Sequence, residues 1–213
     1  ACAPDGMENA RRMAGAAAKV LGIDEDDVVV ASTGVIGQRL PVECIEEHLP
    51  EIKLDADGSE KANLAIMTTD TKTKTAAVEF TVGGKTCRIG GICKGSGMIH
   101  PNMGTMLSFL TTDCAITHEM LTEALQENVR KTYNRVTVDG DTSTNDMCVV
   151  LANGKAGNAL IEWQDEDYQP FCKALNEVNT RLARQIAADG EGATKLVTCT
   201  VKNSRSEEAA ERL

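Results

Sequence analysis

The sequence contains no long apolar run. Its longest purely apolar stretches are short, such as residues 28–31, and none approaches the roughly 18 residues that a membrane helix requires. No basic segment followed by an apolar segment opens the chain, as a secretory signal would. We therefore expect no membrane association, and a globular core drawn from the 42% of residues that are hydrophobic.

Positive charge and aromatic side chains are both scarce. Lys and Arg number 22 against 32 Asp and Glu, which gives a net charge of -10, and only 3% of residues are aromatic. Such a chain repels phosphate backbones, and no basic stripe with interleaved aromatics compensates for this repulsion. The sequence therefore predicts no nucleic-acid partner.

Metal-ligand spacings are also missing. The eight cysteines are scattered, without a CxxC or HxxxH pattern, and the nearest cluster of ligand types is Cys87, Cys93 and His100. Small secreted domains show denser cysteine frameworks. We expect reduced thiols, a cytoplasmic location and no metal.

A nucleotide-binding loop is suggested by one short string and then excluded by its context. Gly84-Lys85-Thr86 resembles the end of a P-loop, but Glu79 stands where the motif needs a glycine, and no helical pattern follows. No other cofactor motif is legible. We expect no bound cofactor.

Hydrophobic periodicity and turn residues predict a mixture of helices and strands. Predicted helices span 5–22, 41–49, 117–132, 167–188 and 206–213, and predicted strands span 28–32, 62–68, 76–82, 85–92, 105–110, 147–152 and 194–201. Gly83-Gly84 predicts a β-hairpin between two of these strands, and the polar turn 139–146 suggests another. The mixture predicts an α+β layered fold.

The most unusual segment is 94–109, where a glycine-rich polar loop runs into an apolar strand through Gly104-Thr105. Three interpretations are open. In the first, the glycines make turns and Thr105 is an ordinary strand residue. In the second, Ser96 and His100 form a nucleophile and its base, although the strand-Gly-x-Ser-x-Gly elbow is absent.

In the third interpretation Thr105 attacks the carbonyl of Gly104 and breaks the chain there. Glycine has the widest φ/ψ range, which suits the strained geometry of such a step. Cleavage would convert an amide into an α-amine with a pKa of about 7.7 to 8.0, a proton acceptor matched to neutral pH. Thr105 would then carry nucleophile and base together.

Four motifs carry a resemblance to a known family. The runs KGSGMIHPNMGTML (94–107), STGVIG (32–37), AIMTTDT (65–71) and DGEGATK (189–195) resemble the ornithine acetyltransferase family, also called the glutamate N-acetyltransferase family, in order and approximate spacing. The resemblance covers nearly the whole chain and corresponds to about the middle half of a family member.

The resemblance implies a layered αββα-type sandwich and a self-cleaving enzyme of arginine biosynthesis. Residues 1–213 would form one catalytic-core unit, in which an α-chain part, 1–104, and a β-chain part, 105–213, stay paired as a hetero-oligomer. Acetyl would pass from N-acetylornithine to Thr105 and then to glutamate in a ping-pong mechanism. Acetyl-CoA is possible as a co-substrate.

The resemblance also implies roles for individual residues. Thr33 and Gly34 fall on the oxyanion hole, and Thr68, Lys94 and Glu191 on substrate contacts, with Thr105 as nucleophile. Each has an ordinary alternative: Thr33-Gly34 can be a strand-ending turn, and a loop lysine or glutamate is usually solvated. One departure concerns the cleavage site, because Gly104 stands where the family commonly has alanine.

Two other functions are open at this stage. An N-terminal-nucleophile amidase or aminopeptidase would use water as the acyl acceptor. An inactive amino-acid-binding domain would keep the fold without the chemistry.

Overall fold

The computed structural model describes residues 3–100 and 106–212. The α-helices are α1 (Gly6–Leu21), α2 (Val42–His48), α3 (Ser59–Ala65), α4 (His118–Lys131), α5 (Tyr168–Ala188) and α6 (Glu207–Glu211). The strands are β1 (Lys74–Val82), β2 (Lys85–Lys94), β3 (Leu107–Thr112) and β4 (Met147–Ala152). Short 3-10 turns are η1 (Glu25–Asp27), η2 (Leu49–Glu51) and η3 (Tyr133–Arg135).

The four strands form one sheet in the order β1-β2-β3-β4. The β1–β2 hairpin is confirmed: Gly83 and Gly84 have φ of 53° and 75°, the positive values that a tight hairpin turn demands. Strand β3 runs antiparallel to β2 but parallel to β4. The second predicted hairpin, at the polar turn 139–146, is therefore wrong, because α4 lies between β3 and β4 as a crossover that returns the chain in the same direction.

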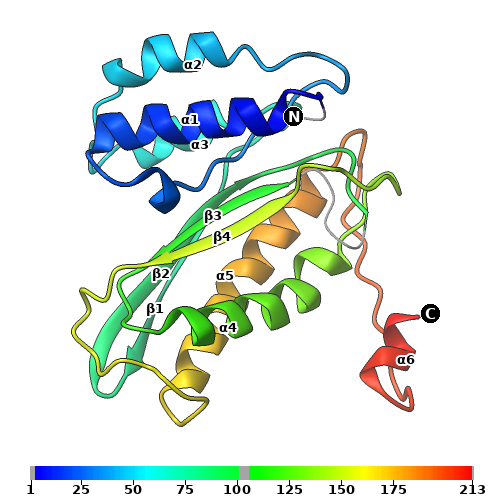
Figure 1. The fold of residues 1–213 in the computed structure, drawn as a ribbon. Coiled ribbons are helices and arrows are strands. Elements are labelled where there is room, and N and C mark those ends of the chain that lie inside the picture. Colours follow the sequence, from blue (N-terminus) through cyan, green and yellow to red (C-terminus); the bar gives the residue numbers. More distant parts are fainter. Residues whose placement is uncertain (1–2, 101–105, 213) are drawn as a thin grey trace.

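The sheet is covered by helices in layers (Figure 1). Helices α4 and α5 lie along one face, and α1, α2 and α3 form a separate group on the opposite side. The apolar stripe predicted for α5 is fully buried against the sheet, namely Phe171, Leu175, Val178, Leu182 and Ile186. The predicted α+β class is confirmed. The predicted αββα sandwich has two sheets between its helical layers, and the described residues form one sheet with helices.

Capping explains where several helices begin and end. The α1 helix ends at Gly22, whose φ of 68° is the left-handed value of a glycine cap. The Thr117 side chain accepts from the Met120 N–H at the start of α4, and Ser206 does the same for Ala209 at α6. Asp5 precedes α1 but makes no side-chain capping hydrogen bond, and its carboxylate pairs with Arg39 at 2.8 Å.

Three predicted strands are absent from the sheet. Residues 62–68 were expected to be a strand, but α3 occupies most of this range, because Ala62, Asn63 and Leu64 are compatible with a helix. Residues 28–32 and 194–201 have no strand assignment, since β-branched composition makes a strand only where a ladder partner exists. No helix in 3–100 or 106–212 is long and apolar enough to cross a membrane.

Candidate functional site

The strand register brings the last residue of β2 and the first residues of β3 and β4 to the same end of the sheet. Lys94, the last residue of β2, pairs with Leu107, the first of β3, and Leu107 pairs with Met147, the first of β4. The Met106 N–H donates to Asp146 Oδ1 at 2.9 Å, and the Met147 N–H donates to the Met106 carbonyl at 3.0 Å. The backbone entering β3 is therefore held between the end of β2 and the start of β4.

Lys94 is a buried cation at this end of the sheet. Lys94 is only 1% exposed, and the carboxylates of Asp70, Asp146 and Glu191 all act on its ammonium. Burial lowers the pKa of Lys94, while the carboxylate of Asp70 acts in the opposite direction. A buried ammonium favours an anionic group beside it, such as a substrate carboxylate.

Asp146 is a buried carboxylate at the same end of the sheet. One of its carboxylate oxygens receives the Met106 N–H, while the other is buried without a hydrogen-bond partner in the described part of the chain. Burial raises the pKa of Asp146. Sequence reasoning did not single out this residue; the signal available was its place at the end of a polar turn, one residue before a predicted strand.

Glu191 reaches the glycine-rich loop from the far end of α5. Its backbone N–H donates to the Ser96 carbonyl at 2.7 Å. Its carboxylate lies so close to Gly97 that a Cβ on Gly97 would stand 2.7 Å from the carboxylate carbon. The loop after β2 therefore needs a glycine at this position to receive the acidic side chain.

Thr68 is exposed and lies just before the sheet, where a neighbouring carboxylate ties it to the same loop. Asp70 accepts the Thr68 N–H at 3.2 Å through one oxygen and the Gly95 N–H at 2.7 Å through the other. The segments that carry Thr68 and Lys94 are thus joined through one side chain.

The glycine-rich loop is also fixed from the β4 side. Asp139 accepts the N–H groups of Met98 at 2.5 Å and Ile99 at 2.9 Å. Met98 has a φ of 53°, a left-handed value that a non-glycine residue adopts only where its surroundings demand it. Although burial raises the pKa of Asp139, these backbone donors, Met98 first, leave it below its ordinary value.

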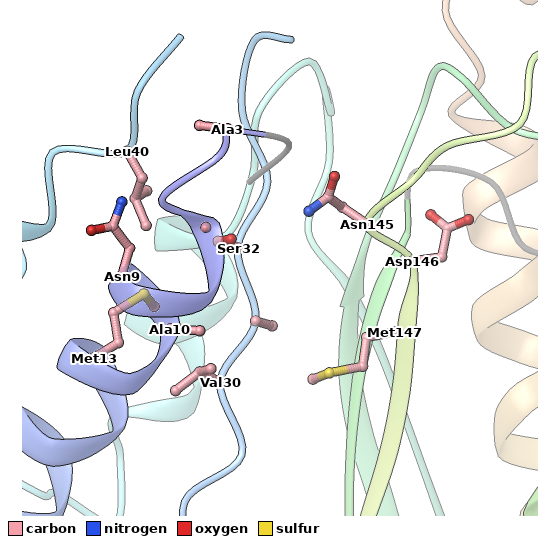
Figure 2. A pocket seen from close by; sticks show the side chains of 12 residues that line it. Ala3, Asn9, Ala10, Met13, Val30, Ser32, Leu40, Asn145, Asp146 and Met147 are labelled. Carbon is pink, nitrogen blue, oxygen red and sulfur yellow. The ribbon is translucent and has the colours of Figure 1, made fainter. Parts of the chain in front are cut away.

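A cavity of about 260 Å³ lies between α1 and the start of β4. Figure 2 shows that Asn145 and Met147 point toward the α1 side, whereas the Asp146 carboxylate points away from it. Ser32 lines the opposite wall, and Thr33 and Gly34 follow it directly along the chain. A Cβ at Gly34 would meet no atom within 4 Å, so the space beside this backbone is open.

Comparison with known proteins identifies the family. The model of the ArgJ family matches residues 1–213. The chain belongs to the ArgJ family.

Several relatives are about 50% identical to this chain over the aligned residues. The arginine biosynthesis bifunctional protein ArgJ of Caldanaerobacter subterraneus is 48% identical over 207 residues, which are 96% of this chain and 51% of the relative. A glutamate N-acetyltransferase of Methanocaldococcus jannaschii is 50% identical over 211 residues, or 97% of this chain and 52% of the relative. The chain therefore spans about half the length of the curated relatives it matches.

A solved structure of an ArgJ protein from Bacillus halodurans is also similar. It is 55% identical in sequence and aligns over 43% of each chain with a TM-score of 0.42.

The structure brings together three of the residues predicted as substrate contacts. Thr68, Lys94 and Glu191 belong to segments that meet at one end of the sheet, and Thr33-Gly34 adjoins the cavity beside β4. Gly104 and Thr105 lie outside the described residues.

The alternative nucleophile pair is not assembled. The Ser96 hydroxyl shares a hydrogen bond with the Thr69 hydroxyl at 2.6 Å, and His100 Nδ1 lies 3.5 Å from the Thr137 hydroxyl. The Ser96–His100 interpretation therefore has no direct contact to support it.

The nearest cluster of metal-ligand residue types in the sequence, Cys87, Cys93 and His100, is likewise not assembled as a metal site in the described part of the chain. Cys93 is buried in the core, where burial raises its thiol pKa to about 12, and His100 is exposed. Within 3–100 and 106–212, no three His, Cys, Asp or Glu residues gather as metal ligands would.

Proposed function

We propose that this chain carries the acetyl-transfer site of a glutamate N-acetyltransferase, with Thr105 as the nucleophile. The observation that carries the proposal is the meeting of Lys94, Glu191 and Asp146 beside Met106, the residue that follows Thr105. Membership of the ArgJ family and the name of the Methanocaldococcus relative support the same activity.

The first step is cleavage of the chain between Gly104 and Thr105. The α-chain part is then 1–104 and the β-chain part 105–213, and the two remain paired. The Thr105 hydroxyl attacks the Gly104 carbonyl and the C–N bond between the two residues breaks, which gives an ester and a free α-amine on Thr105. Water then hydrolyses the ester, which restores the hydroxyl and leaves a carboxylate on Gly104. This amine, with an ordinary pKa of about 7.7 to 8.0, serves as the base for the next steps.

Acetyl transfer then runs through an acetyl-Thr105 ester. The Thr105 hydroxyl attacks the acetyl carbonyl of N-acetylornithine while its proton passes to the α-amine. The C–N bond breaks, and ornithine leaves with that proton on its nitrogen. The amino group of glutamate attacks the ester, which forms N-acetylglutamate and restores the hydroxyl. Acetyl-CoA is a possible alternative donor.

The surrounding residues have roles that follow from their charge and position. Thr33 and Gly34 supply a hydroxyl and a backbone N–H to the oxyanion of the tetrahedral intermediate. The Lys94 ammonium binds the substrate carboxylate, and the Glu191 carboxylate holds the amino group of the substrate. Thr68, on the adjoining exposed segment, donates or accepts a hydrogen bond at the same amino acid.

Denaturing mass spectrometry of the purified protein tests the cleavage step. We expect two fragments that meet at residues 104 and 105 in place of the 22.7 kDa chain, and Thr105→Ala should abolish them. Thr111→Ala, which removes an exposed threonine hydroxyl on strand β3, is the matched control and should leave cleavage unchanged.

Incubation with N-acetylornithine, with and without glutamate, tests the transfer step. Ornithine release that depends on glutamate supports an acetyltransferase, whereas release into water without glutamate supports an amidase. An intact chain that persists on storage and releases no ornithine would indicate an inactive binding domain. Normal acetyl transfer by Thr105→Ala would overturn the proposal.

A further inference from the structure

A buried cluster of three charged side chains lies directly behind the proposed substrate site. The Lys74 ammonium, in a side chain 1% exposed, lies 2.6 Å from Asp70 Oδ1 and 2.6 Å from Asp189 Oδ2. It also donates to the Lys72 carbonyl at 3.2 Å. We call Asp70, Lys74 and Asp189 the ion cluster.

Each carboxylate of the ion cluster holds a different backbone segment. Asp70 accepts the N–H groups of Thr68 and Gly95, at 3.2 Å and 2.7 Å. Asp189 accepts the Thr71 N–H at 3.0 Å and also the Thr71 hydroxyl. Lys74, which bridges the two carboxylates, therefore joins the loop before β1, the loop after β2 and the end of α5.

The three proposed substrate contacts all lie on these segments. Thr68 donates its own N–H to the ion cluster, Lys94 immediately precedes Gly95, and Glu191 is two residues beyond Asp189. These contacts come from distant parts of the chain, and Lys74 and Asp189, which join those parts, differ by 115 in sequence. No single helix or strand could hold all three in place.

Stability alone does not account for a buried cluster of this kind. Desolvating a lysine and two carboxylates costs several kcal/mol per ion, and well-packed apolar side chains of similar volume often stabilise a fold as well or better. What charged groups provide is direction, because each carboxylate oxygen accepts a specific backbone N–H. A site built from three segments needs its supporting residues fixed in this way.

We propose that Lys74 is a positioning residue for substrate, acting through Asp70 and Asp189 to hold Thr68, Lys94 and Glu191 in register with one another. This inference rests on the proposed function. It assigns the ion cluster no contact with substrate and no part in the cleavage at Thr105.

The principal test is Asp189→Asn, which keeps the shape of a side chain that is 7% exposed and removes its charge. Asp167→Asn is the matched control: it lies at the other end of α5 and accepts the Gly83 N–H at 3.0 Å in the β1–β2 turn. We expect Asp189→Asn to lower kcat/KM roughly 10- to 100-fold, mainly through KM, as misplacement by about 1 Å would. Self-cleavage should stay normal in Asp189→Asn, and Asp167→Asn should leave both kcat/KM and self-cleavage unchanged.

Hydrogen exchange provides a readout that needs no catalytic activity. Asp189→Asn should speed exchange at the Thr71 and Glu191 amides, and Lys74→Met should extend the effect to Thr68 and Gly95. The β1–β2 turn should exchange at the wild-type rate in both variants. If Lys74→Met does not fold, Asp189→Asn alone decides.

The outcomes separate this inference from the proposed function. A wild-type protein without acetyl transfer refutes the function, while the exchange rates still report whether the ion cluster holds the three segments. Transfer by the wild type, with Asp189→Asn matching Asp167→Asn in KM and in exchange at Thr71 and Glu191, overturns the positioning role.

Discussion

Gly97 is the position where a single methyl group would act most directly on the site. Its hypothetical Cβ would lie 2.7 Å from the Glu191 carboxylate carbon and 2.8 Å from one of its oxygens. Glu191 is exposed and its carboxylate is the far end of a flexible side chain, so it can turn away at little cost in stability. The effect of a larger residue should therefore appear in binding.

We expect Gly97→Ala to raise KM for N-acetylornithine or glutamate roughly 10- to 100-fold, which corresponds to losing one hydrogen bond to a charged group. Steady-state kinetics measure this effect. The control is Gly15→Ala in α1, where the nearest atom to the new Cβ would be a Glu25 oxygen at an ordinary 3.4 Å. The control should leave KM unchanged and add about 0.5 to 1 kcal/mol of stability, and equal KM values for the two variants would contradict the prediction.

At the scale of elements, the buried hydroxyl of Tyr133 connects η3, β3 and α5. Tyr133 in η3, just after α4, donates to Asn179 Oδ1 of α5 at 3.1 Å and shares a hydrogen bond with Ser108 of β3 at 2.9 Å. Burial raises the pKa of Tyr133 well above its ordinary value, so the hydroxyl stays neutral at physiological pH. Its hydrogen bonds therefore fix how α4 and α5 sit on the sheet.

Tyr133→Phe should lower the free energy of unfolding by about 1 to 3 kcal/mol, because two buried partners lose their hydrogen bond. Urea denaturation at pH 7 measures the change. Tyr168→Phe is the comparison variant and should cost less, since the hydrogen bond from the Tyr168 hydroxyl to the Met120 carbonyl is long, at 3.5 Å. A loss for Tyr168→Phe that equals or exceeds the loss for Tyr133→Phe would argue against this account.

The elements that sequence predicted correctly are those whose signals are local. The stripe of α5 and the Gly83-Gly84 turn depend on neighbouring residues, so both were predicted correctly. The segments 28–32 and 194–201 failed because a strand needs a partner, and β-branched composition does not reveal whether one exists. The parallel β3–β4 pairing was missed although the helix predicted between them was a usable signal, since parallel neighbours require a crossover.

The same limit applies to the candidate site. The motifs around Thr68, Lys94 and Glu191 pointed to these residues, but the ion cluster behind them did not appear in any local pattern. Lys74 and Asp189 lie 115 residues apart, and only the packing of α5 against β1 brings them together. Long-range pairing of this kind is set by tertiary structure, which periodicity and spacing do not encode.

At the scale of the whole molecule, the ion cluster makes stability depend on pH in acid. Burial raises the pKa of Asp189, but hydrogen bonds from Lys74 and Thr71 outweigh burial and bring the value to about 2, below the ordinary 3.8. The pKa of Asp70 is lowered in the same way, since burial is outweighed by the Gly95 N–H and Lys74. Carboxylates with lowered pKa stabilise the fold above the ordinary value, and this contribution is lost as the pH falls through the folded-state value.

Unfolding free energy should therefore decrease between pH 4 and pH 2, and Asp189→Asn should reduce that decrease by about 2 kcal/mol. Asp146 acts in the opposite direction, because burial raises its pKa and protonation relieves the fold of a buried charge. Chemical denaturation at several pH values checks the expectation. A decrease of the same size in wild type and Asp189→Asn would show that Asp189 contributes nothing to it.

The two sides of the proposed cut are interleaved. Strands β1 and β2 precede it in the sequence, whereas β3, β4 and α5 follow it, yet β2 pairs with β3 and α5 packs on β1 and β2. Neither product could keep a closed core by itself, so the two could separate only by unfolding together. Isotopically labelled and unlabelled halves, mixed after maturation, would therefore stay with their original mates, and every molecule would remain the pair translated from a single message.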